Sequence, residues 1–114
     1  MVKYQYVFSV TMVKNTLDTK IIRGSALSGI LRKLKIDIPQ GWQFSAGVRF
    51  EFGRSKTLPT TNVDNTEKYY TGDDTDLDLS PDLVLLEDVI EIFGINNDVS
   101  NDHSCIVTME IEST

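Results

Sequence analysis

The 114-residue sequence has one cysteine, one histidine and no long hydrophobic run. A single thiol cannot form an internal disulfide, and it excludes metal sites that need several cysteines. No apolar stretch approaches the roughly 18 residues of a membrane-spanning helix. The N-terminus begins directly with a strand pattern and lacks the apolar block and cleavage site of a signal peptide. We therefore expect a cytoplasmic protein with no membrane segment, in which Cys105 is a core thiol and His103 lies at a strand end.

Sequence motifs of the common enzyme classes are also missing. There is no glycine-rich phosphate loop, no nucleophile elbow and no zinc-ligand spacing. Asp74, Asp76 and Asp78 fit the first positions of an EF-hand calcium loop. However, Leu79 and Leu85 occupy the positions that require Gly and Glu. We therefore predict a non-enzymatic protein with no catalytic residues, no metal site and no cofactor.

Basic residues are scarce in the second half of the chain. Residues 1–56 contain ten Lys or Arg and three Asp or Glu, a net charge of +7. Residues 57–114 contain one Lys and fourteen Asp or Glu, a net charge of −13, which gives the chain its total of −6. Such a division indicates either an electrostatic partner or two halves that neutralise each other in the folded protein.

Three stretches alternate apolar and polar residues with the period of two that is typical of strands. They are residues 3–12, 42–52 and 103–112. A weaker strand is expected at residues 67–71. The residues predicted to point inward from the second and third stretches are Trp42, Phe44, Ala46, Val48, Phe50, Phe52, Cys105, Val107, Met109 and Ile111.

Two further stretches space their apolar residues as a helix does. Ser25 would cap the first helix, which Pro39 and Gly41 would end. Ser80 and Pro81 suit the N-cap and first position of the second helix. The predicted apolar stripes contain Ala26, Leu27, Ile30, Leu31 and Leu34 in the first helix and Leu83, Leu86, Ile90 and Phe93 in the second.

This order of elements predicts a single α+β domain over residues 1–114. The order matches the ferredoxin-like β-α-β-β-α-β sandwich, an antiparallel sheet with two helices on one face, in which residues 67–71 would form the third strand. The alternative is another α+β arrangement in which the region around Asp18 forms its own hairpin.

The segment Gly24-Ser25-Ala26-Leu27-Ser28-Gly29-Ile30-Leu31-Arg32 is similar to the Gly-Ser-x-Leu-x-Gly-x-Leu-Arg segment of RAMP-type CRISPR effector subunits. The similarity covers nine of the 114 residues, and the chain lacks that family's glycine-rich loop near the C-terminus. In those proteins the segment follows a strand and opens the first helix. The resemblance implies a ferredoxin-like fold and RNA binding.

The acidic half supplies the leading candidate for a binding surface. We predict that its carboxylates pair with Arg and Lys on a basic partner protein, after electrostatic steering. A nucleic-acid-binding protein is the expected partner, and an inhibitor from a phage or mobile element that mimics nucleic acid is the expected type of protein. The candidate residues are Asp73, Asp74, Asp76, Asp78, Glu87, Asp88 and Glu91.

Two alternatives use other parts of the charge pattern. In the first, the basic half binds nucleic-acid phosphates, with Tyr4 or Tyr6 stacking on bases. Its candidate residues are Arg23, Arg32, Lys33, Lys35, Arg49 and Arg54. In the second, the oppositely charged halves join copies of the chain head to tail into a homo-oligomer with a structural role.

Overall fold

The computed structural model describes residues 2–53, 56–59 and 68–113, and every regular element in them is a β-strand. The predicted α+β ferredoxin-like fold is therefore wrong, because the described chain is all-β with seven antiparallel strands. No helix in the described ranges is long and apolar enough to cross a membrane. The strands are β1 (Lys3–Met12), β2 (Thr16–Ile38), β3 (Ala46–Phe52), β4 (Lys56–Leu58), β5 (Thr75–Leu79), β6 (Leu83–Asn96) and β7 (His103–Glu112).

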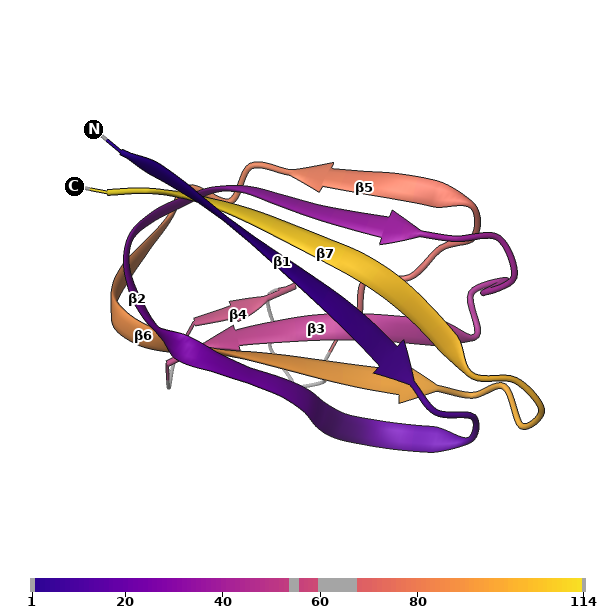
Figure 1. Cartoon of the computed structure of the whole chain (residues 1–114). Coiled ribbons are helices and arrows are strands. Elements are labelled where there is room, and N and C mark those ends of the chain that lie inside the picture. Colours follow the sequence, from indigo (N-terminus) through magenta and orange to yellow (C-terminus); the bar gives the residue numbers. More distant parts are fainter. Residues whose placement is uncertain (1, 54–55, 60–67, 114) are drawn as a thin grey trace.

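The strands form one sheet that folds over into two layers (Figure 1). The strand order is β1-β7-β2-β6-β3-β4, and β5 pairs with β2. The second half of β2 joins β1, β7 and β5 in what we call the β7 layer. The first half of β2 joins β6, β3 and β4 in what we call the β3 layer. A single 23-residue strand thus belongs to both layers.

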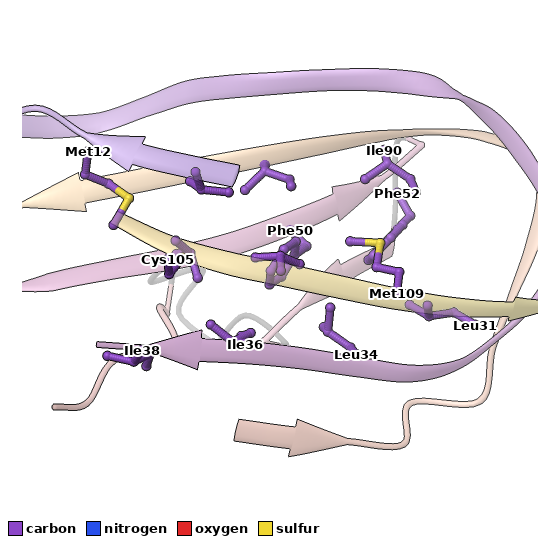
Figure 2. Packing of buried hydrophobic residues seen from close by; sticks show 14 of the residues in the cluster. Met12, Leu31, Leu34, Ile36, Ile38, Phe50, Phe52, Ile90, Cys105 and Met109 are labelled. Carbon is purple, nitrogen blue, oxygen red and sulfur yellow. The ribbon is translucent and has the colours of Figure 1, made fainter. Parts of the chain in front are cut away.

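The hydrophobic core lies between the two layers (Figure 2). Met12, Ile36 and Met109 come from strands of the β7 layer. Phe50 and Ile90 come from the β3 layer. All five side chains are fully buried, so removal of apolar surface from water holds the layers together.

Two of the predicted strands are confirmed. β1 and β7 occupy residues 3–12 and 103–112, and the four residues predicted to point inward from β7 are buried. β3 begins only at Ala46, so Phe44 precedes the strand and its side chain is 71% exposed instead of buried. The weak strand at residues 67–71 is reduced to one bridge between Tyr70 and Val48, and Glu67 lies outside the described residues.

The first predicted helix is part of β2. Leu34, Ile36 and Ile38 are buried while the residues between them are partly exposed, which is the period of a strand. The register between β2 and β7 shifts at residues 31–33, so that Leu31 and Leu34 both face the core although they are three residues apart. This shift imitates helical spacing. The segment that resembles RAMP proteins lies in this strand, so the helix and the fold implied by the resemblance are absent here.

The second predicted helix is replaced by β6 and the connection from β5. Asp82 and Glu87 have φ angles of 49° and 56°, in the left-handed region that an α-helix cannot use. Opposite Leu27 and Gly29 of β2, one extra residue of β6 forms a bulge. Leu85 and Ile90 on either side of it are both buried, because the bulge reverses the alternation. Leu86, expected in the apolar stripe, is 74% exposed.

Gly29 lies where β2 passes from one layer to the other. Its φ angle is +133°, which L side chains rarely adopt. A Cβ atom at this position would lie 2.6 Å from the backbone oxygen of Glu112 and 3.0 Å from Cγ2 of Ile111. The close passage of β2 beside the end of β7 therefore requires glycine.

We predict that Gly29→Ala lowers the free energy of unfolding by about 2–4 kcal/mol, because it combines backbone strain with a clash against main chain. Gly41→Ala is the matched control, since Gly41 has a φ angle of +117° but open space around its Cβ position. It should cost only about 1–2 kcal/mol. Urea denaturation measures both values, and equal losses would contradict the clash at Gly29.

Candidate functional site

The outer face of the β7 layer, which points away from the core, carries two neighbouring hollows. The first has a volume of about 480 Å³ and is lined from four strands, by residues that include Gln5, Thr108, Lys35 and Asp78. The second, of about 410 Å³, includes Asp37, Asp74, Asp76, Ser104 and Ile106. Both hollows are open to solvent and lined by polar and apolar atoms.

Charge is distributed unevenly over this face. In the first hollow Lys35 lies directly opposite Asp78 on β5, so unlike charges face each other. In the second hollow, Asp37 lies directly opposite Asp76, so two negative charges face each other. We call Asp37, Asp74, Asp76 and Asp78 the acidic rim. Three of the seven acidic residues predicted from the sequence belong to it, and Asp37 was missed because its strand was assigned to a helix.

The carboxyl groups of Asp37 and Asp76 interact directly. A side-chain hydrogen bond with Asp37 raises the pKa of Asp76, and the negative charges of Asp37 and Asp78 raise it further. The raised pKa reflects the cost of holding negative charges close together. Lys35 Nζ lies 3.5 Å from Asp37 and opposes this effect. The acidic rim therefore contains carboxylates that repel each other and that a further cation would stabilise.

The second hollow also includes Cys105, whose side chain is buried. Burial, helped by the charge of Asp37, raises the pKa of its thiol to about 12. The thiol therefore stays protonated at neutral pH and is a poor nucleophile. Across the described ranges of the chain, no group of three or more His, Cys, Asp or Glu residues is arranged to hold a metal ion.

The other acidic candidates lie apart from this rim. Asp73 accepts a hydrogen bond of 2.8 Å from the backbone N–H of Gly41 and thereby joins two loops. Glu87, Asp88 and Glu91 belong to β6, beside or beyond the bulge. Asp88 pairs with Lys56 and Glu91 pairs with Lys20, and the pairing with Lys56 lowers the pKa of Asp88. The predicted seven-residue surface is thus divided between the exposed rim, a loop contact, ion pairs within the chain and Glu87, which is exposed on the bulge of β6.

The basic candidates are dispersed over the structure. Arg23 lies in the first half of β2, whereas Lys33 and Lys35 lie in the second half and on the other layer. Arg32 lies 3.0 Å from Asp82 and 3.4 Å from Glu112. Arg54 lies outside the described residues. Their placement forms no continuous basic surface across the described strands.

Arg49 is the centre of a charged cluster on the outer side of the β3 layer. Its side chain is only 8% exposed, its guanidinium bonds both oxygens of Asp18 at 3.0 and 2.7 Å, and it lies 3.9 Å from the ring centroid of Phe93. Tyr69 also donates to Asp18, and burial together with that bond raises the pKa of Tyr69 to about 12. No local sequence signal identifies this cluster, because Asp18 and Arg49 are 31 residues apart.

We predict that Asp18→Asn lowers the free energy of unfolding by about 2 kcal/mol, because it removes the bidentate anionic partner of a buried guanidinium. Glu51→Gln is the control, since Glu51 approaches the same Arg49 with one contact of 3.4 Å. It should cost less than about 1 kcal/mol. Both values come from chemical denaturation, and a larger effect at Glu51 would contradict the dominance of the Asp18 pair.

Comparison with models of protein families, with curated proteins and with solved structures gave no match for this chain.

Proposed function

We propose that this protein is a non-enzymatic binding protein whose acidic rim docks on a basic surface of a partner protein. The observation that carries the proposal is the pair formed by Asp37 and Asp76, which lie directly opposite each other on an open face, where the interaction raises the pKa of Asp76. Like charges in this position destabilise a sheet. A guanidinium or ammonium group of a partner would turn this repulsion into two charge-assisted hydrogen bonds.

The surroundings of the pair suit a long basic side chain. Ile106 is 40% exposed and lines the same hollow, which gives the aliphatic stem of Arg or Lys an apolar surface to lie on. Asp76 and Asp78 are alternate residues of β5, so their carboxylates lie about 7 Å apart along the strand. This spacing resembles that of neighbouring phosphates along a nucleic-acid strand. A nucleic-acid-binding protein is therefore the class of partner that we propose, with the rim in the place of the phosphates.

The dispersed basic residues favour this function over nucleic-acid binding. Arg32 and Arg49 are both engaged with carboxylates of the same chain. A phosphate backbone would have to displace those carboxylates and approach a chain of net charge −6. Among the described residues, only Lys35 forms an ion pair with the acidic rim, through one contact of 3.5 Å with Asp37, so a partner cation would meet less competition there.

We predict that Asp76→Asn weakens binding of a short arginine-rich peptide by about tenfold, because one charge-assisted hydrogen bond is lost. Isothermal titration calorimetry at low and high salt measures the affinity, which should fall as salt rises. Glu87→Gln is the control because it removes the same charge from an exposed position on the bulge of β6. It should change the affinity less than about twofold. Equal losses in the two variants would show that the peptide responds only to net charge.

The same titration gives a pH dependence with a definite sign. A cation competes with the proton that Asp76 binds at low pH, and the interaction with Asp37 raises the pKa of Asp76. Peptide affinity should therefore increase as the pH rises through that pKa, and Asp76→Asn should remove most of the increase. An affinity that is constant over the acidic range would contradict a role for the Asp37–Asp76 pair.

A further inference from the structure

The two-layer fold leaves strand edges whose hydrogen-bonding groups have no neighbouring strand among the described residues. These edges include β1, β4, β5, the first half of β2 and the beginning of β6 at residues 83–88. Exposed edges pair readily with other chains, and proteins usually block them with charges, prolines, bulges or short strands. The way each edge is blocked therefore indicates which of them is available for pairing.

Four of these edges carry such features. The beginning of β6 contains the bulge opposite Leu27 and Gly29. β5 presents Asp76 and Asp78. β4 has only three residues and is followed by Pro59. The first half of β2 is interrupted by repeated register shifts and carries Lys20 and Arg23. Each of these edges is therefore a poor template for another strand.

β1 lacks these protections. It pairs with β7 through ten consecutive residue pairs without a register shift. Its sequence, KYQYVFSVTM, has no proline, no glycine and no carboxylate. The single charged side chain, Lys3, lies 3.5 Å from Glu110 of β7. A regular strand about 33 Å long is thus presented along one edge of the sheet.

The side chains of β1 also remain incompletely covered. Tyr4, Tyr6 and Phe8 lie on the side of β1 whose later residues face the core. Tyr4 is 49% exposed, and Tyr6 and Phe8 are only partly buried. Val7 on the opposite side is 63% exposed. Apolar surface therefore borders the open edge on both sides of the sheet, and a neighbouring strand would cover it.

We propose that β1 pairs antiparallel with β1 of a second copy of this chain, so that the β7 layer continues across a two-fold symmetric dimer. In antiparallel pairing, directly opposed side chains lie on the same face of the sheet. A two-fold axis perpendicular to the sheet then requires that one residue of β1 lies opposite itself. An axis at Val7 places Val7 opposite Val7, Tyr6 opposite Phe8 and Gln5 opposite Ser9.

This pairing explains why a second copy is the occupant. It brings an aromatic pair and an aliphatic pair together, both of which stabilise neighbouring strands. Lys3 would lie opposite Thr11, so no like charges meet. A chain of net charge −6 repels its own copies over most surfaces, whereas β1 has no carboxylate to oppose the association.

Sedimentation velocity across the micromolar range tests the dimer. We expect a concentration-dependent dimer that Val7→Lys weakens by about tenfold or more, because two ammonium groups would then face each other in place of two valines. Val99→Lys is the control, since Val99 is 71% exposed in the turn between β6 and β7. It should leave the dimer unchanged. Thermal unfolding of each variant as a monomer shows that Val7→Lys keeps the fold.

Mixing Val7→Lys with Val7→Glu tests the register itself. Each variant alone should be monomeric, and the mixture should regain the dimer because unlike charges then lie opposite each other. A wild-type chain that stays monomeric at every concentration would overturn the proposal, and so would a dimer that Val7→Lys leaves intact. Failure of the mixture to associate would overturn the axis at Val7.

Discussion

The structure depends on the continuity of β2. A 23-residue strand must leave one layer and enter the other without breaking its pairing, and it does so at Gly29, where the backbone adopts a conformation that side chains disfavour. Beyond this point the strand pairs with β7 and β5, and before it with β6. The crossing of β2 at Gly29 encloses the core between the two layers. It also forms the outer face of the β7 layer, because it brings β2 and β5 beside β7 and β1.

The charge division of the sequence is largely resolved inside the folded chain. Lys20 with Glu91, Arg32 with Glu112 and Lys56 with Asp88 each join a basic residue of the first half to an acidic residue of the second. The strand order produces the first two pairs, since β2 lies between β6 and β7, whereas Lys56 of β4 lies beyond β3 from Asp88 of β6. The acidic rim differs from them because Asp37 comes from the basic half and increases the local negative charge. Among the described residues, these four carboxylates have one ion pair, between Lys35 and Asp37, and this excess of negative charge on an open face is the reason to propose binding at the rim instead of at the acidic half as a whole.

The two proposed surfaces lie at opposite sides of the β7 layer. The acidic rim lies at the edge formed by β5 and the end of β2, and β1 is the opposite edge, two strands away across β7 and β2. A dimer through β1 would therefore leave both rims accessible and place them on one continuous sheet. Two linked rims would engage a basic partner with higher avidity than one, provided that the partner spans both sites.

The sequence by itself determined the strands whose alternation is uninterrupted. β1, β7 and the part of β3 from Ala46 onward were predictable because side chains on the two faces of a regular strand alternate strictly. It also determined the absence of any disulfide and the acidic character of residues 73–78. The tertiary structure alone decided β2 and β6. Shifts near Arg32 and Glu87 change the phase of the alternation, so buried residues fall three apart in β2, which imitates a helix, and five apart in β6, which breaks the period of a strand. Only partner strands distant in sequence supply the hydrogen bonds that favour the extended chain, and the same long-range pairing brings Asp37 to Asp76 and Asp18 to Arg49.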